Sequence, residues 1–217
     1  MTLREELIGR PAAPPRPAPY RLLAPAGWRR VPADVLTDVF GETAIERLKD
    51  ADRPDLVLQM RGMLSQLRRS LRSTHVFEAY LPPTLDGDPQ PAVLTVAPFV
   101  RPSDVSWADA VGRAARGAEV VQPDFTATSM WRWTNDHSER RGTDEPAIRT
   151  RAQHYVVPVG VDAPERRGLH FVHTVLAADD TQPALSDDAL TPTRLTELLL
   201  ETGDVILSTF RWVDVED

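Results

Sequence analysis

Histidine is the residue type in this sequence best suited to acid–base chemistry or metal binding, and the chain has five: His75, His137, His154, His170 and His173. His170 and His173 are three residues apart in an extended segment, so they point to opposite faces. If the loop 160–168 closes a symmetric hairpin, His154 lies opposite His173. Two imidazoles would begin a metal site, but a third ligand is needed, and neither segment contains Asp or Glu. We therefore expect hydrogen-bonded strand histidines, no metal and no cofactor.

A polar segment brings the side chains of a Ser–His–acid triad together in sequence: Asp136, His137, Ser138 and Glu139. A triad depends on spatial geometry and not on adjacency, so we interpret 135–146 as a solvated loop. The sequence has no cysteine, which excludes disulfides, thiolate metal sites and a thiol nucleophile. It also lacks the phosphate-binding, zinc-protease and nucleophile-elbow motifs. The expectation is a protein that is not an enzyme and has no catalytic residue.

Two tryptophans and three arginines are candidate binding residues. Trp131 and Trp133 flank an arginine and could stack a base or a sugar, but the formal net charge of -7 argues against a nucleic-acid partner. We interpret both tryptophans as core or interface aromatics. Arg61, Arg68 and Arg72 lie off the apolar stripe of an expected helix, where they form either a solvated face or a surface for an acidic partner.

The apolar periodicity predicts four helices and a series of strands. Helices are expected at 33–50, 55–72, 106–116 and from Thr191 onward, the last with Leu195 and Val205 among its core residues. Strands are expected at 20–24, 75–81, 92–100, 118–122, 124–133, 148–159 and 169–177. Successive strands form hairpins and do not alternate with helices. This order favours the α+β class, with an antiparallel sheet of about six strands flanked by helices.

The chain divides into a Pro-rich arm at residues 1–19, which we expect to be flexible, and a single domain at residues 20–217. Residues 1–20 carry no apolar run of signal-peptide length. No segment approaches the roughly 20 apolar residues of a membrane span. We therefore expect a cytoplasmic protein with no membrane insertion.

Two sequence motifs, one near each end of the expected domain, carry a family resemblance. The first is the apolar run from Tyr20 followed by Pro25, Gly27 and Trp28, and the second is the run Leu198 to Trp212, which finishes on Ser-Thr-Phe-Arg-Trp. Together they resemble the opening strand and the closing helix of Mog1/PsbP-like domains. The chain is similar in particular to a group of actinobacterial proteins with extra helices after the first strand, here residues 33–72. The resemblance implies an α/β/α sandwich with a two-helix insertion after the first strand.

The family consists of binding and accessory modules: one class binds a small GTPase, another supports a photosystem complex, and others accompany secreted effectors. No catalytic residue is shared across them. The resemblance therefore implies a non-catalytic, protein-binding accessory or chaperone-like module, with a link to a secretion system among its roles.

The partner is expected to be another protein, bound by an exposed part of the sheet and by the two helices. The candidate surface residues are Trp131, Trp133, His154, His173, Arg61, Arg68 and Arg72. One alternative is a small-ligand-binding protein or cryptic enzyme, with a pocket near the tryptophans, His154 and His173. Another alternative is a structural homo-oligomer.

Overall fold

The computed structural model of the chain describes residues 18–50, 52, 54–85, 88–139, 148–160, 165–177 and 192–213. Most of the expected Pro-rich arm lies outside these ranges. So do residues 140–146 of the expected loop and Thr191, the expected start of the last helix.

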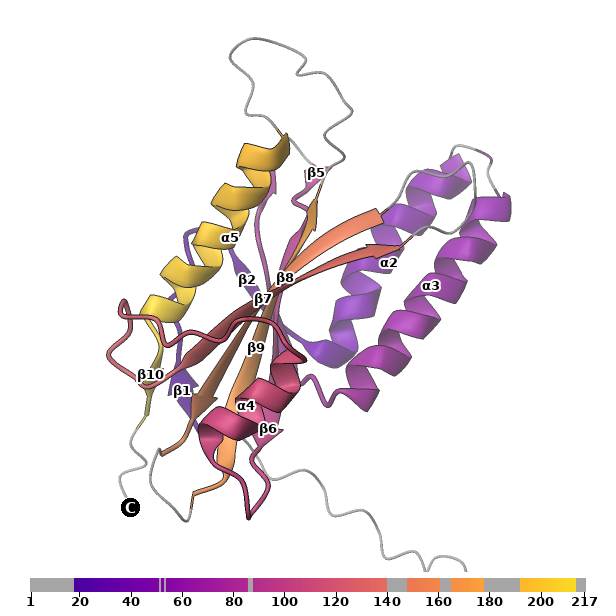
Figure 1. Cartoon of the computed structure of the whole chain (residues 1–217). Helices are drawn as coiled ribbons and strands as arrows, with labels where there is room; N and C mark the ends of the chain where they lie inside the picture. The colour runs from indigo at the N-terminus through magenta and orange to yellow at the C-terminus, as the bar shows by residue number, and fades with distance from the viewer. Residues whose placement is uncertain are drawn as a thin grey trace, which may run out of the picture.

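A six-stranded antiparallel sheet forms the centre of the described structure, in the order β2-β3-β6-β9-β8-β7 (Figure 1). Its strands are β2 (Arg29–Pro32), β3 (Glu78–Leu81), β6 (Ala92–Val100), β7 (Trp131–Glu139), β8 (Ile148–Pro158) and β9 (Arg167–Ala177). Two short pairs lie outside it: β1 (Tyr20–Arg21) with β10 (Arg211–Trp212), and β4 (Thr84–Leu85) with β5 (Asp88–Pro89). The α+β class and the antiparallel sheet of about six strands are confirmed.

One face of the sheet is covered by helix α5 (Pro192–Ser208). Ile206 and Leu207 of this helix are buried in the same core cluster as Tyr155 and Phe171, which the alternation of β8 and β9 places on one face. Two residues expected in this core, Leu195 and Val205, are 40% and 60% exposed. That expectation was wrong because both residues lie on the solvent side of α5.

The closing motif does not stay helical to its end. Helix α5 ends at Ser208, and Arg211–Trp212 forms β10, which pairs with β1 in the register Tyr20↔Trp212. The Phe210 ring stacks on Tyr20, with ring centroids 5.7 Å apart, and meets Trp212 edge to face at 4.9 Å. The two motifs on which the family resemblance rests are therefore side by side.

The opposite face carries helix α4 (Trp107–Ala115) at one end (Figure 1). Ser106 caps it, because its hydroxyl accepts a hydrogen bond from the Asp109 backbone N at 3.1 Å. The helix ends at Arg116, whose φ of 51° lies in the left-handed region. Its buried face packs Trp107 and Val111 against residues of β7 and β8.

Helices α2 (Ala33–Asp50) and α3 (Pro54–Ser73) form a hairpin that stands beside the sheet (Figure 1). Its base joins the sheet through an apolar cluster that contains Leu36 and Leu71 together with Ala79 and Leu81 of β3. The two helices directly follow β2, the second strand in chain order.

Strand boundaries differ most from the sequence-based expectation around β7. The expected strand at 124–133 begins only at Trp131, and 118–122 contributes only the isolated bridge Val121↔Arg132. The polar residues 135–139, expected in a loop, instead continue β7. They stay extended because each pairs with β8, and Asp136 accepts a hydrogen bond from Arg151 of that strand at 2.6 Å.

The close approach of α2 and α3 depends on Gly41. A Cβ added there would lie 2.5 Å from Leu64 Cδ1, whereas a Cβ at Gly62 of α3 would meet nothing within 4 Å. We predict that Gly41→Ala lowers the free energy of unfolding by roughly 1 kcal/mol, because overpacking against Leu64 outweighs the helix preference of alanine. The matched control Gly62→Ala should raise it by about 0.5–1 kcal/mol, because alanine favours the helix. Urea unfolding measures both, and a stabilising Gly41→Ala would contradict the helix contact.

Candidate functional site

Three neighbouring strands bring an aromatic residue and two imidazoles together on the α4 face. Trp133 of β7 pairs with His154 of β8, and their rings stack at 4.7 Å with an interplanar angle of 1°. His170 of β9 lies 5.5 Å from the same tryptophan ring. His154 Nδ1 is 3.1 Å from His170 Nε2, so one imidazole donates a hydrogen bond to the other. Sequence reasoning named His170 but did not pair it with His154.

Burial keeps both imidazoles of this pair neutral. Desolvation lowers the pKa of His154 to about 4. Desolvation, followed by the charge of His154, lowers the pKa of His170 to about 3. At neutral pH each ring therefore carries one N–H and one lone pair. The far nitrogen of His154, Nε2, lies 3.4 Å from the Asn135 side-chain amide, which continues the polar chain along β7.

Both candidate tryptophans are buried. Trp131 is 8% exposed and stacks on Trp107 of α4 at 6.1 Å, and Trp133 is 2% exposed. Their faces are therefore covered by helix α4 and by the imidazole pair. Stacking of a base or sugar on either ring would require these neighbours to move.

His173 lies on the opposite face of the sheet from His154, contrary to the symmetric hairpin expected from the sequence. The register pairs His154 with Val172 and Gln153 with His173, one residue away from that expectation. Because side chains alternate along a strand, one residue of offset places the imidazole under α5. The expected His154–His173 pair, and any pocket that both residues would line, are therefore wrong.

Beneath α5, the His173 side chain is fully buried and packs against Gly203, where an added Cβ would collide with its Nδ1 atom. Neither ring nitrogen has a hydrogen-bond partner among the described residues. Desolvation lowers the pKa of His173 to about 4, and the nearby carboxylate of Asp204 opposes this. The neutral imidazole is thus the form that the fold accommodates.

Asp204 is the polar residue that ties α5 to the sheet. Its carboxylate accepts hydrogen bonds from Tyr155 OH at 2.8 Å, from Gln153 Nε2 at 3.1 Å and from Arg132 Nη1 at 2.8 Å. Burial, and then the charge of Asp204, raises the pKa of Tyr155. Sequence reasoning missed this network. The available signal was an aspartate next to Gly203 and only two residues before the buried Ile206 in an amphipathic helix.

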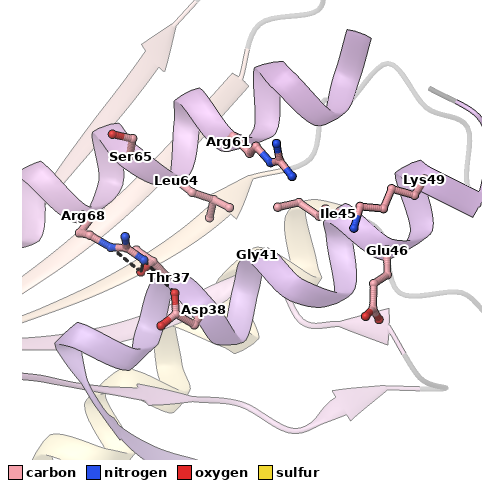
Figure 2. Close-up of a pocket in the computed structure, with 10 residues that line it drawn as sticks. All are labelled: Thr37, Asp38, Gly41, Ile45, Glu46, Lys49, Arg61, Leu64, Ser65 and Arg68. Atoms are coloured by element: carbon pink, nitrogen blue, oxygen red, sulfur yellow. Dashed lines mark hydrogen bonds and ion pairs between the residues drawn. The ribbon is translucent and has the colours of Figure 1, made fainter. Parts of the chain in front are cut away.

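A different kind of site lies between the paired helices α2 and α3. An open groove of about 430 Å³ runs along the hairpin (Figure 2). Its lining residues are Thr37, Asp38, Gly41, Ile45, Glu46, Lys49, Arg61, Leu64, Ser65 and Arg68. Two of the three candidate arginines, Arg61 and Arg68, thus line one groove. Arg72, one turn beyond Arg68, is exposed but is not among the lining residues.

Charged side chains of both signs line the groove (Figure 2). Asp38, Glu46 and Lys49 stand on α2, and Arg61 and Arg68 stand on α3. Arg68 closes one end, because it donates hydrogen bonds to Thr37 Oγ1 at 3.0 Å and to Asp38 Oδ1 at 2.8 Å. The groove floor between the walls is partly apolar.

The hollow continues beyond Arg61 toward the turn between the two helices. A second cavity of about 330 Å³ shares Lys49 and Arg61 with the first and is also lined by Pro54, Val57 and Leu58. Leu58 is 70% exposed, the largest exposure, together with Leu23, among the large apolar side chains that the structure describes. Its position at this end adds an apolar contact point to a charged groove.

Comparison with known proteins adds no assignment: no family model matches the chain, and no curated protein matches it. Within the described ranges, no helix is both long enough and apolar enough to cross a membrane. Those same ranges hold no group of three or more His, Asp or Glu side chains placed to bind one metal ion.

The buried His173 predicts a loss of stability in acid. Its pKa rises from about 4 in the folded state to about 6.5 in the unfolded state. The contribution of His173 to the free energy of unfolding is therefore fully present above pH 6.5. It decreases by about 3 kcal/mol as the pH drops toward 4. We predict that, between pH 7 and pH 4, the free energy of unfolding falls by about 3 kcal/mol more in the wild type than in His173→Leu.

Urea unfolding at the two pH values measures this difference. His137→Leu, at an exposed position on β7, is the matched control and should keep the wild-type pH dependence. Equal pH dependence in wild type and His173→Leu would show that His173 is not held neutral by the fold.

Proposed function

We propose that this chain is a non-catalytic protein-binding accessory module, and that the α2–α3 groove is its docking surface. The observation that carries the proposal is the open groove on a helix hairpin that stands beside the sheet (Figures 1 and 2). The family resemblance supports the accessory role and adds a chaperone-like function toward a secretion substrate.

The groove chemistry fits one kind of occupant, an amphipathic helix from another protein. Ile45 and Leu64 supply an apolar floor, which a row of apolar side chains on one face of a helix can cover. Acidic residues of that helix would face Arg61 on α3 and Lys49 on α2, the two basic residues that both cavities share.

Leu58 gives the occupant a further anchor at the end of the groove. An exposed apolar side chain at the rim of a charged groove is typical of a contact site, and burial of a leucine stabilises a complex by about 1.5–3 kcal/mol. Arg61 stands between Leu58 and the main groove because both cavities share it. We therefore expect Arg61 to be the most sensitive charged position.

A site-specific crosslinker placed at Ser65, inside the groove, tests the docking surface in cells of the native host. We predict that it captures one defined protein, and that the same crosslinker at the exposed Ser103, in the connection between β6 and α4, does not. The captured segment is then identified by mass spectrometry. Capture of the chain itself would support the homo-oligomer instead, and equal capture at both positions would contradict a groove site.

The affinity of the captured partner gives a second, quantitative test. Arg61→Glu should weaken binding about tenfold or more, which corresponds to at least 1.4 kcal/mol. Arg69→Glu makes the same charge change on the same helix, at an exposed position that does not line the groove, and should leave affinity within about twofold. Isothermal titration calorimetry measures both, and equal losses would mean that only overall charge matters.

A further inference from the structure

The imidazole pair on the α4 face has a geometry beyond that of a simple hydrogen bond. His154 Nδ1 and His170 Nε2 are 3.1 Å apart and belong to two adjacent strands. Imidazole nitrogens bind divalent transition metals at about 2.0–2.1 Å, so two of them in neighbouring coordination positions stand about 2.9–3.4 Å apart. The observed separation lies within this range.

We propose that His154 and His170 form a two-nitrogen site for a divalent transition-metal ion, with Cu²⁺ the preferred metal. Among the first-row divalent ions, Cu²⁺ binds nitrogen ligands most tightly, and it accepts two adjacent nitrogens in a tetragonal arrangement. Its remaining positions are filled by water or by a small anion. This follows because the described residues supply no third His, Asp or Glu ligand at the pair.

The strands and the tryptophan hold the pair in place before any ion arrives. His154 is stacked on Trp133, and His170 is in edge contact with Phe99 at 6.1 Å. These contacts restrict the rotation of both rings, which lowers the entropy cost of ordering two ligands. Both side chains keep partial exposure, unlike the fully buried His173, so an ion from solvent can reach them.

Metal binding requires a change of tautomer in the pair. In the metal-free pair, one ring N–H lies between the two nitrogens. Binding requires that ring to change tautomer, so that both facing nitrogens present lone pairs and the N–H groups lie on the far side.

The Asn135 side chain can accept a hydrogen bond from the N–H that the change of tautomer places on His154 Nε2. Its amide is 3.4 Å from His154 Nε2, and turning the amide by half a rotation presents the oxygen in place of the nitrogen. A hydrogen bond from His154 Nε2 to this oxygen would fix the metal-binding tautomer, as outer hydrogen bonds do for most metal-bound histidines. Asn135 is therefore a positioning residue for the proposed site.

Titration of the full, untagged chain with Cu²⁺ tests the proposal. We expect one ion per chain with a dissociation constant in the range of about 1–100 μM, measured by calorimetry and by quenching of tryptophan fluorescence. The electron paramagnetic resonance spectrum should show coupling to two nitrogens. His154→Gln and His170→Gln should each weaken binding about tenfold or more.

Three control variants separate the pair from other sources of binding. His137→Gln and His75→Gln remove exposed histidines away from the pair and should leave the titration unchanged. Trp133→Phe should reduce the amplitude of the quenching, because the Trp133 ring is the fluorophore stacked on His154.

Two results would overturn the proposal. The first is no binding at about 1 mM Cu²⁺, which would leave the pair as a hydrogen bond alone. The second is binding that survives both His154→Gln and His170→Gln, which would place the ion elsewhere. Circular dichroism of each variant checks that the fold is retained, and Zn²⁺ titrated in the same way should bind more weakly than Cu²⁺.

Discussion

The antiparallel register of β8 against β9 is the constraint on which the chemistry of this protein depends. Side chains alternate between the two faces of a strand, so the register decides which residues lie under α5 and which face α4. Here it pairs His154 with Val172 and Gln153 with His173. The consequence is one histidine enclosed under a helix and two others placed side by side, partly buried, on the opposite face.

The two faces of the sheet are stabilised by different interactions, hydrogen bonds to a carboxylate on one and stacked rings on the other. Under α5, Asp204 gathers three donors from β7 and β8, so a charged residue can lie against the core and fix the helix position. On the other face, Trp133 and the imidazole pair fill the surface next to α4 with rings that stack. The α2–α3 hairpin lies outside both arrangements and joins the sheet at its base, which leaves the groove between its helices open.

Much of the fold could be predicted from the sequence, because local patterns determine it. Helix α2 occupies the expected residues 33–50, and α4 (Trp107–Ala115) lies within the expected 106–116. The limits of β7 could not be predicted, since 135–139 is polar and extended only through pairing with β8. Pairing between distant segments has no local signature in such residues.

The candidate sites were predicted less completely, for a related reason. Arg61 and Arg68 were identified by their place off the apolar stripe of α3, but the groove that they share requires the position of α2. The imidazole pair depends on the hairpin register, and an offset of one residue changed the partner of His154 from His173 to Val172. A symmetric loop was the natural assumption, and the loop itself contains no residue type that fixes the register.

A disulfide crosslink measures that register most directly, because the chain contains no cysteine of its own. Ala152 is paired with Thr174. The hydrogen bond from Val159 N to Arg167 O marks a hydrogen-bonded pair, and because such pairs alternate along the ladder, Ala152 and Thr174 form a non-hydrogen-bonded pair. Cross-strand disulfides fit at such a pair. The double variant Ala152→Cys/Thr174→Cys should therefore oxidise readily to an intramolecular disulfide. Ala152→Cys/Val175→Cys, the pair that a symmetric hairpin requires, should not. If the second pair crosslinks and the first does not, His154 lies opposite His173, and the assignment of the three histidines to the two faces of the sheet is contradicted.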